Sequence, residues 1–325
     1  MDLSAAEAGL SAWLAAGFHG SMQYMAAHGL MRARPAELVP GTVRVITARM
    51  DYLPRDAPPD WPAAETRRLA EPAQAVISVY ARGRDYHKVL RQRLQRVADR
   101  LAAEIGPFGH RVFTDSAPVQ EVELASRSGL GWRGKHTLAL HREGGSMFFL
   151  GEIYVDLPLP LSEPVSAHCG ACTACLDACP TQAIVAPYRL DARRCICYLT
   201  IENDGPIPPE FRAAMGNRIY GCDDCQIACP WNKYARQSTL PDFDVRIGHE
   251  TLLELWAWTE AEFLDRTQGS AIRRIGAVRW RRNLAVALGN AWRETGDPAL
   301  HEALSEAADT GLVREHIEWA LAQRP

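Results

Sequence analysis

The stretch that decides the fold is Cys169–Pro180, which reads CGACTACLDACP and has the spacing C-x2-C-x2-C-x3-C-P. This spacing is typical of chains that hold cubane iron–sulfur clusters. Three thiolates on one tight loop can each reach one iron of the same cube, while the fourth is carried onward to a neighbouring cluster. The stretch therefore predicts two [4Fe–4S] clusters that lie close together.

A second cysteine run, Cys222–Pro230, follows with the spacing C-x2-C-x3-C-P. It lacks its first thiolate, because Ile219 stands where that cysteine would be, and Cys195 or Cys197 can supply the replacement. In two-cluster ferredoxins the last cysteine of each run crosses over to the other cluster. This rule assigns the first cluster to Cys169, Cys172, Cys175 and Cys229. It assigns the second cluster to Cys179, Cys222, Cys225 and one of Cys195 or Cys197.

Other uses of these cysteines fit the sequence less well. All nine cysteines lie between residues 169 and 229. Structural zinc sites also use C-x2-C pairs, but they need only four ligands and no third cysteine followed by proline. Disulfides are typical of small secreted domains, and a chain of 325 residues is long enough to build its own core. We interpret the cysteines as cluster ligands, with a pair of zinc sites as the alternative.

Composition sets further limits. The chain of 325 residues has room for two or three domains, and 47% hydrophobic with 23% charged residues is ordinary for a globular protein. The net charge of -3 gives no general attraction to nucleic acid, so such a contact would need a local basic patch. No basic segment precedes an apolar one at the N-terminus, and no apolar run approaches the length of a membrane span. We therefore expect a cytoplasmic protein.

Residues 1–160 are expected to form an α/β domain. Four β-rich stretches alternate with helical patterns, which predicts a sheet covered by helices. The expected strands are Thr42–Met50, Val76–Tyr80, Arg111–Thr114 and Met147–Val155. The clearest helix carries an amphipathic stripe at spacings of four, three, four and four. Its members are Leu90, Leu94, Val97, Leu101 and Ile105. The proline-rich segment Leu157–Pro164 marks the end of this domain.

Residues 161–235 are predicted to be a bacterial-ferredoxin-like two-cluster domain, and residues 236–325 a set of α-helical repeats that resembles a short solenoid. Within the last part, Ala271–Asn290 is expected to turn Ile275, Val278, Leu284 and Leu288 inward. Five arginines are expected on its outside: Arg273, Arg274, Arg279, Arg281 and Arg282. Such a cluster favours a phosphate-binding surface. The alternative is a solvated face that pairs with acidic residues elsewhere.

Asp115 follows a predicted strand and precedes a helical pattern, where side chains often point into a cleft. An aspartate before Ser-Ala-Pro also suits the N-cap of a helix, and the spacing alone does not separate these two interpretations. The glycine-rich stretch Gly129–Thr137 indicates close approach of a ligand to the backbone. It has neither the Walker spacing nor the dinucleotide-binding G-x-G-x-x-G context.

Taken together, these stretches resemble the epoxyqueuosine reductase family, whose members are cobalamin-dependent iron–sulfur enzymes of tRNA modification. The similarity covers nearly the whole chain in family order, beyond the two cysteine runs. The stretches that carry it are Trp13–Gly20, Arg32–Pro35, Gly83–Lys88, Thr114–Pro118, Gly129–Thr137, Phe148–Glu152, Arg194–Glu202, Gly221–Gln226, Cys229–Asn232 and Ala271–Ile275. The resemblance implies an α/β cobalamin-binding domain, the two-cluster domain and C-terminal HEAT-like repeats.

The resemblance also implies roles for single residues. Asp115 matches the family's proton donor near the cobalt, and Cys195 matches the unusual ligand of the second cluster. Cys197 lies close to cobalamin, where the family usually has serine. Corrin contacts are expected from main-chain groups around Ala139 and Leu150. Side-chain contacts are expected from Arg32 and Lys135. No D-x-H-x-x-G motif occurs, so the protein is not expected to supply a histidine to the cobalt.

The expected partners follow from the same resemblance. The substrate is tRNA with a GUN anticodon (the tRNAs for Asp, Asn, His and Tyr), gripped by the C-terminal arginines. A ferredoxin- or flavodoxin-type protein donates the electrons, and the enzyme is expected to be a monomer without membrane contact. Two other functions remain as alternatives: a reductive-dehalogenase-like enzyme acting on a small molecule, and a ferredoxin-type electron carrier without enzymatic activity.

Three features depart from the family pattern. Family members usually have a further helix and strand before the region of Trp13, so the first element of the fold is in question. Val122 follows Glu121 where the family often has arginine, which can alter contacts near the site. Cys197 offers a second choice of cluster ligand in place of Cys195.

Overall fold

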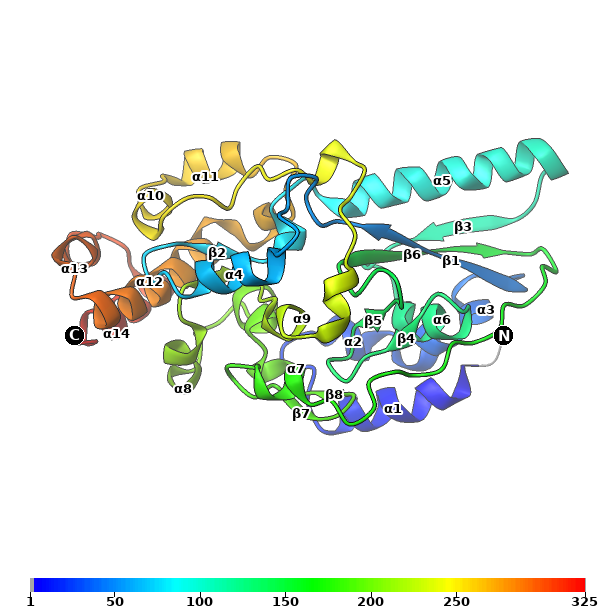
Figure 1. Ribbon diagram of the computed structural model, residues 1–325, viewed down its shortest axis with the longest axis horizontal. Helices are drawn as coiled ribbons and strands as arrows, with labels where there is room; N and C mark the ends of the chain where they lie inside the picture. The colour runs from blue at the N-terminus through cyan, green and yellow to red at the C-terminus, as the bar shows by residue number, and fades with distance from the viewer. Residues whose placement is uncertain (1–2, 325) are drawn as a thin grey trace.

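A three-stranded antiparallel sheet forms the framework of the N-terminal half of the computed structural model, which describes residues 3–324. Its strand order is β1-β6-β3, with the eight-residue β6 at the centre (Figure 1). Arg44 on β1 lies opposite Val155 on β6, and Asp51 lies opposite Phe148. The strands are β1 (Arg44–Asp51), β3 (His110–Phe113) and β6 (Phe148–Val155). Three of the four expected strands are therefore confirmed as members of one sheet.

Helices cover both faces of this sheet, as the alternation along β6 requires. α5 (Tyr86–Ile105) lies on one face, where Phe149, Ile153 and Val155 point, and α6 (Glu121–Arg127) lies on the other (Figure 1). Gly151 allows the close approach of α5, because a Cβ atom there would lie 2.7 Å from a methyl group of Leu94. The rest of this half contains helices α1 (Ser4–Ala15), α2 (Gln23–Ala27), α3 (Pro35–Leu38) and α4 (Trp61–Leu69).

The expected stripe on α5 is correct only for its first half. Leu90 and Leu94 are buried together with Val89 and Ala98, but Val97 and Ile105 are exposed. The buried residues Leu90, Leu94 and Ala98 follow a spacing of four, so Val97 lies off the face that packs on the sheet, and Ile105 lies at the exposed end of the helix.

The expected strand Val76–Tyr80 does not join the main sheet. Only β2 (Val76–Ile77) is extended, and it pairs in parallel with β9 (Arg218–Tyr220), which precedes the second cysteine run. Ile77 and Ala81 belong to the same buried core as the C-terminal helices. This segment of the N-terminal half therefore packs into the core of the C-terminal helical part.

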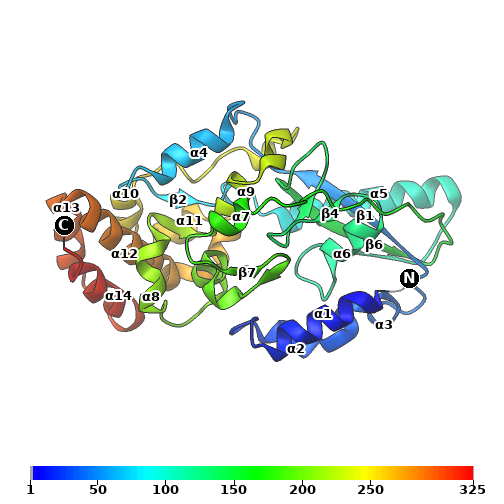
Figure 2. The same ribbon diagram turned by 60° about the horizontal axis from the view of Figure 1, so that its bottom comes forward.

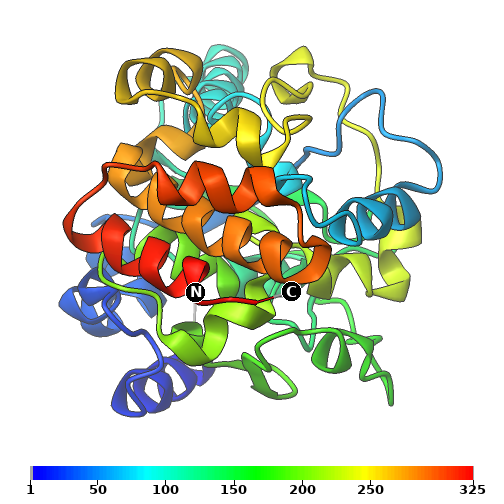
Figure 3. The same cartoon turned by 90° about the vertical axis from the view of Figure 1, so that its left-hand side faces the viewer.

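The C-terminal part is helical, and a central helix organises it (Figure 3). α12 (Gly276–Thr295) contacts each of its neighbours α10 (Leu252–Trp256), α11 (Glu260–Arg266), α13 (Pro298–Ser305) and α14 (Gly311–Leu321). Ile275, Leu284 and Leu288 are buried as expected. The expectation for Val278 is wrong: its side chain is 58% exposed, because it precedes Trp280 on the first turn, before the covering helices close around α12.

The cysteine-rich region connects these two parts and contributes only short elements. They are α7 (Ala174–Asp177), β7 (Ile184–Ala186), β8 (Arg189–Leu190), α8 (Pro209–Arg212) and α9 (Asp224–Ile227). The hairpin of β4 (Trp132–Arg133) and β5 (Ala139–Leu140) carries the glycine-rich stretch toward it. Figure 2 shows the N-terminal helices on one side of this region and the C-terminal helices at the far end. Among residues 3–324, no helix is long and apolar enough to cross a membrane.

Candidate active site

A cavity of about 370 Å³ lies where the sheet, the β4–β5 hairpin and the second cysteine run meet. Its wall includes Asp115, Thr137 and Phe148 from the N-terminal half and Cys225 from the cysteine-rich region. Asp115 and Thr137 both have positive φ values, 49° and 73°, which are uncommon for residues other than glycine. Strained backbone of this kind clusters at functional sites, and here two such residues face one cavity.

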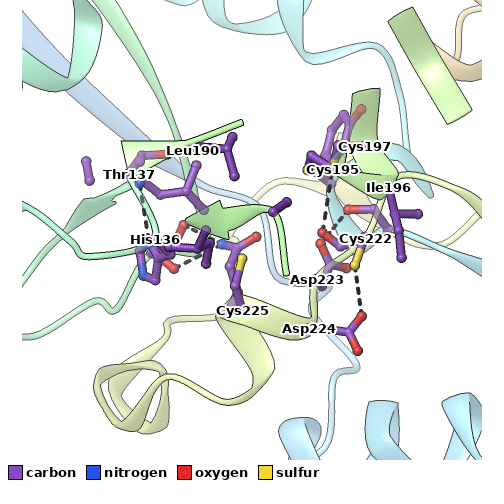
Figure 4. A pocket seen from close by; sticks show the side chains of 18 of the residues that line it. His136, Thr137, Leu190, Cys195, Ile196, Cys197, Cys222, Asp223, Asp224 and Cys225 are labelled. Carbon is purple, nitrogen blue, oxygen red and sulfur yellow. Dashed lines mark hydrogen bonds between the residues drawn. The ribbon is translucent and has the colours of Figure 1, made fainter. Parts of the chain in front are cut away.

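The cysteines assigned to the second cluster line this same cavity. Figure 4 shows Cys195, Cys197 and Cys222 on one side of it and His136, Thr137 and Leu190 on the other, with Cys225 between the two groups. Cys179, the crossover cysteine of the first run, lies in the wall as well. The arrangement brings the predicted second-cluster ligands next to the predicted catalytic residue.

The hydrogen bonding of the two candidate thiols favours Cys195 as the ligand. A hydrogen bond from Cys197, opposed by burial, lowers the pKa of Cys195 to about 7. The same bond, together with burial, raises the pKa of Cys197 well above its usual value. The Cys197 thiol also donates to the main-chain oxygen of Cys222 at 3.5 Å. Since the thiolate is the form that binds metal, these shifts favour the prediction that Cys195 is the ligand.

A second cavity of about 270 Å³ collects the other four cysteines. Its wall contains the set assigned to the first cluster: Cys169, Cys172, Cys175 and Cys229. Among residues 3–324, no three His, Cys, Asp or Glu side chains converge as ligands of a single metal ion would. Four thiols spaced around a cavity suit the corners of a cube-shaped cluster better than the tetrahedral zinc alternative.

The N-cap interpretation of Asp115 is wrong, because α6 begins only at Glu121 and its N-cap is Gln120. The Asp115 carboxylate instead accepts hydrogen bonds from the hydroxyl of Tyr86 and from Nε2 of His87, the latter at 3.1 Å. Burial alone would raise the pKa of Asp115, but these hydrogen bonds hold it below its usual value. A proton donor must hold a proton, but these hydrogen bonds favour the ionised form of Asp115.

Two neighbouring carboxyl groups carry the opposite shift. Burial and the charge of Asp115 raise the pKa of Glu121 to about 8. Burial, with the charges of Glu121 and Asp115, raises the pKa of Glu152 well above its usual value. Glu121 Oε1 accepts the backbone N–H of Asp115 at 2.5 Å, and Glu152 has no hydrogen-bond partner among residues 3–324. The exposed carboxyl of Asp115 is therefore charged, and the carboxyls of Glu121 and Glu152 are neutral.

Sequence reasoning missed the residues that control Asp115. Tyr86 and His87 lie at the start of α5, next to the N-cap Asp85. Although burial opposes it, hydrogen bonds to Asp115 and Asp85 raise the pKa of His87 to about 9. The available signal was the stretch Gly83–Lys88, which served only as part of the family resemblance. A titratable residue at a helix start has no distinctive spacing, so its partner 28 residues later could not be assigned.

The predicted corrin contacts fall into two groups. Ala139 and Leu150 line the large cavity. Arg32 is buried beneath Tyr24 and donates to its main-chain oxygen at 3.0 Å, outside the cavity wall. The Lys135 ammonium donates to main-chain oxygens in the loop of the first cluster, so its side chain serves the other cavity.

His136 supplies a test of whether these cavities suit a bound group. Its Nδ1 accepts the N–H of Leu138 at 3.2 Å, and burial lowers the pKa of the ring to about 4. The proton of the neutral ring is therefore on Nε2, which is buried without a partner among the described residues. His136 borders both cavities, and its unused donor fits a group that fills one of them.

The five predicted arginines do not form one exposed surface. Arg273 and Arg274 are exposed; Arg273 donates to the main-chain oxygen of Leu264, and Arg274 pairs with Glu202. Arg274 also lies close enough to Asp115 to lower its pKa, although burial of Asp115 has the larger, opposing effect. Arg274 therefore lies within electrostatic reach of the active site.

The other three arginines are held within the protein. Arg279 donates to three main-chain oxygens, and Arg281 forms two 2.6 Å hydrogen bonds with Asp309. Arg282 was expected outside, but it is fully buried and donates to three main-chain oxygens and to Asn283. The expectation is wrong because α12 is enclosed on nearly every side, including the side of this arginine.

Comparison with known proteins matches two family models to this chain. Residues 32–116 match the model described as epoxyqueuosine reductase QueG, DUF1730, and residues 168–232 match a 4Fe-4S double cluster binding domain. The iron–sulfur function of the cysteine-rich region is therefore shown by its family.

Relatives match over nearly the full length. An epoxyqueuosine reductase of Alicycliphilus denitrificans is 68% identical, covering 99% of this chain and 92% of the relative. That of Escherichia coli is 54% identical over 99% and 84% of the two chains. A crystal structure of an epoxyqueuosine reductase with a modified tRNA-Tyr stem loop has a TM-score of 0.85 at 27% identity, over 99% and 84% of the chains. A Bacillus subtilis structure, whose catalytic aspartate loop is swung out of the active site, has a TM-score of 0.81 at 26% identity, over 100% and 93%. The protein belongs to the epoxyqueuosine reductase family.

Proposed function

We propose that the protein reduces epoxyqueuosine to queuosine at the wobble position of tRNA anticodons. The observation that carries the proposal is the large cavity, which Asp115 shares with the cysteines of the second cluster. A carboxylate and an electron source on one cavity can serve a reduction in which a carbon–oxygen bond breaks and the oxygen takes up protons. The epoxyqueuosine-modified stem loop bound by a structural relative supports this substrate.

Cobalamin is the cofactor we propose for this cavity. The apolar wall, the main chain around Ala139 and Leu150 and the unused Nε2 donor of His136 fit a large ring with amide side groups. When bound, cobalamin would supply a strongly reducing cobalt centre for cleavage of the carbon–oxygen bond. Cys197, with its proton retained, would border the ring, and Asp115 would face the substrate. The Bacillus subtilis relative is described as having a catalytic aspartate loop, which supports a catalytic aspartate here.

Electrons are proposed to enter through the first cluster. Its cavity is bordered by the exposed Lys233 and Tyr234, and a shallow hollow beside it is lined by Arg142 and Arg236. Glu143 pairs with Arg236 and is the one acidic side chain of that hollow. This basic surface suits an acidic one-electron donor of the ferredoxin or flavodoxin class. We propose that the enzyme is a monomer. We also propose that it works in the cytoplasm, since both the substrate tRNA and such donors are found in the cytoplasm.

The tRNA contact is proposed for Arg273 and Arg274, which are exposed, because Arg274 lies within electrostatic reach of Asp115. We propose tRNAs with GUN anticodons as substrates, because the modified base occupies the wobble position. A splayed anticodon loop suits this recognition better than a duplex.

Replacing Arg273 and Arg274 together by glutamate should weaken binding of an anticodon stem loop at least about tenfold at physiological salt. The slope of log affinity against log salt should fall by about 0.7 for each phosphate that the variant no longer neutralises. Filter binding or fluorescence anisotropy at several salt concentrations measures both quantities. Arg100→Glu, an exposed arginine on the outer side of α5, is the matched control and should bind normally. Unchanged affinity in the double variant would remove this segment from the tRNA-binding surface.

The proposed function is tested on protein purified without oxygen. Iron and acid-labile sulfide should each approach eight atoms per chain, as two [4Fe–4S] clusters require, and corrin should bind in a one-to-one ratio. The chemically reduced protein should convert an epoxyqueuosine-containing stem loop, as followed by chromatography of the nucleosides. Protein that carries both clusters but neither binds corrin nor converts the stem loop would contradict the proposal.

A further inference from the structure

The ring of His87 is held between two carboxylates. Nδ1 lies 2.8 Å from Oδ1 of Asp85, and Nε2 lies 3.1 Å from Oδ2 of Asp115. An ionised carboxylate can only accept hydrogen bonds, so each ring nitrogen must carry a proton. Asp85 is fixed as an acceptor because the same Oδ1 also receives the backbone N–H of His87 at 3.1 Å. The geometry therefore holds His87 as an imidazolium.

Asp115 separates this imidazolium from the reaction cavity. Asp115 lines the cavity, whereas His87 lies behind it. The same Oδ2 atom accepts from both His87 and the Tyr86 hydroxyl. A proton that leaves His87 for the cavity must consequently pass through Asp115.

A second proton is stored on the other side of Asp115. Glu121 lines the cavity, and its Oε1 accepts the Asp115 backbone N–H at 2.5 Å. Glu152 lies within electrostatic reach of both and is buried without a partner among residues 3–324. Closely spaced carboxylates cannot all ionise in a buried site. With Asp115 charged by its two donors, the neighbouring carboxyls of Glu121 and Glu152 hold protons.

The chemistry requires two protons. Loss of the epoxide oxygen as water breaks two carbon–oxygen bonds, forms one carbon–carbon π bond and makes two O–H bonds. It consumes two electrons, delivered one at a time from the clusters, and two protons that end on the departing oxygen. We propose that Asp115 passes the first proton to this oxygen, taking it from His87, and that Glu121, which lines the same cavity, supplies the second. The inference rests on the proposed reduction of an epoxide and adds the source of its protons.

This arrangement explains how an ionised Asp115 can serve as the acid. Alone, a carboxyl group with a lowered pKa would hold almost no proton at neutral pH. Paired with His87, whose pKa its two carboxylate partners raise to about 9 against the effect of burial, it always has a proton within reach. A useful catalytic acid has a pKa near the working pH, and the pair meets this condition where Asp115 by itself does not.

Other titratable groups bear on the same atoms, and of the groups named here only Tyr86, His87 and Glu121 are replaced in the test. The groups around His87 are Asp85 and Asp115. The groups around Asp115 also include Tyr86, Arg274, Arg32 and Tyr24. The groups around Glu121 are Asp115, His87, Glu152 and Tyr154.

The experiment is a single turnover with cobalamin-loaded protein whose clusters have been reduced beforehand, so that no external reductant affects the pH dependence. The probe is an epoxyqueuosine-containing anticodon stem loop, and the rate of its conversion is measured between pH 6 and pH 10. Wild type should slow above about pH 8, where Glu121 loses its proton. Iron, sulfide and the electron paramagnetic resonance spectrum verify that each variant retains both clusters.

His87→Ala should be about 10²-fold slower at pH 7. Its rate should begin to fall at least one pH unit below the pH at which the wild type slows, which is called the pH limb here. Added imidazole should restore part of the rate. His87→Gln provides a second variant in case the alanine protein loses its clusters. Glu121→Gln keeps the acceptor for the Asp115 N–H but has no proton to give. It should be slower, and its limb should move upward to about pH 9, where His87 titrates.

Tyr86→Phe is the matched control for positioning. It removes the other hydrogen bond to Asp115 without removing a stored proton, so its rate should fall while the wild-type pH limb is kept. If the His87 and Glu121 variants also keep the wild-type pH limb, these residues only position Asp115, and the proposal that they supply the protons is wrong. If the reduced wild-type protein converts no stem loop at any pH, the proposed function is wrong, and the proposal about the source of its protons is wrong with it.

Discussion

Asp115→Asn is expected to slow the conversion of epoxyqueuosine by about 10²–10⁴-fold, the usual contribution of a positioned acid. The substitution removes the group that faces the cavity and receives hydrogen bonds from Tyr86 and His87. Asparagine tolerates the positive φ of 49° at this position, so the loop should keep its course. Single-turnover kinetics on a modified stem loop measure the effect, with iron and corrin contents that should match the wild type.

Ser116→Ala is the control for the loop itself. Ser116 is adjacent and exposed, and its hydroxyl interacts with Thr114 and Arg91 rather than with the cavity. This variant should turn over at the wild-type rate. Asp115→Ala should behave as Asp115→Asn does if the lost proton transfer dominates. Normal turnover in either Asp115 variant would reduce this residue to a structural role.

The two-cluster domain could be predicted from the sequence because the spacing of its cysteines reflects the geometry of a cluster. The first run places three thiolates on one short loop, where they can bind the same cubane. The crossover of Cys179 and Cys229 follows from the same rule, and the structure places each of them in the expected cavity. The choice between Cys195 and Cys197 depended on hydrogen bonds that spacing does not encode.

The proton chemistry could not be predicted for the same reason. Asp115 was identified from the sequence, but its ionisation is set by Tyr86 and His87, which contact it from the start of helix α5. Likewise, Asp223 lies within the second cysteine run, yet its role is to accept hydrogen bonds from Ser78 and from the N–H of Val79. Contacts between residues far apart in sequence determine pKa values, and no local pattern reports them.

The arginine cluster shows the limit of counting charges. Five arginines in ten residues predicted a surface, but a helix enclosed by its neighbours must bury some of its polar side chains. Arg282 is buried because main-chain oxygens from another segment require donors there. Only Arg273 and Arg274, in the turn before α12, remain exposed as expected.

Arg282→Met is expected to lower the free energy of unfolding by about 3–5 kcal/mol, the cost typical of removing one side of a buried polar network. The guanidinium donates to the main-chain oxygens of Leu199, Asn203 and Gly205 at 2.7–2.8 Å. Methionine fills a similar volume but leaves these oxygens buried without donors.

The position of those oxygens extends the effect to the second cluster. Leu199 lies in the π-helical turn Tyr198–Glu202, which directly follows the Cys195–Cys197 segment. Arg282→Met should therefore unfold at a lower temperature and also lose iron faster to a chelator, with the loss confined to about half of the iron. Arg273→Met removes an exposed arginine from the same region and should change the free energy of unfolding by no more than about 0.5 kcal/mol. Thermal unfolding of the two variants, with iron release followed by absorbance, makes the comparison. Equal stability of the two variants would mean that α12 does not brace the second-cluster segment through Arg282.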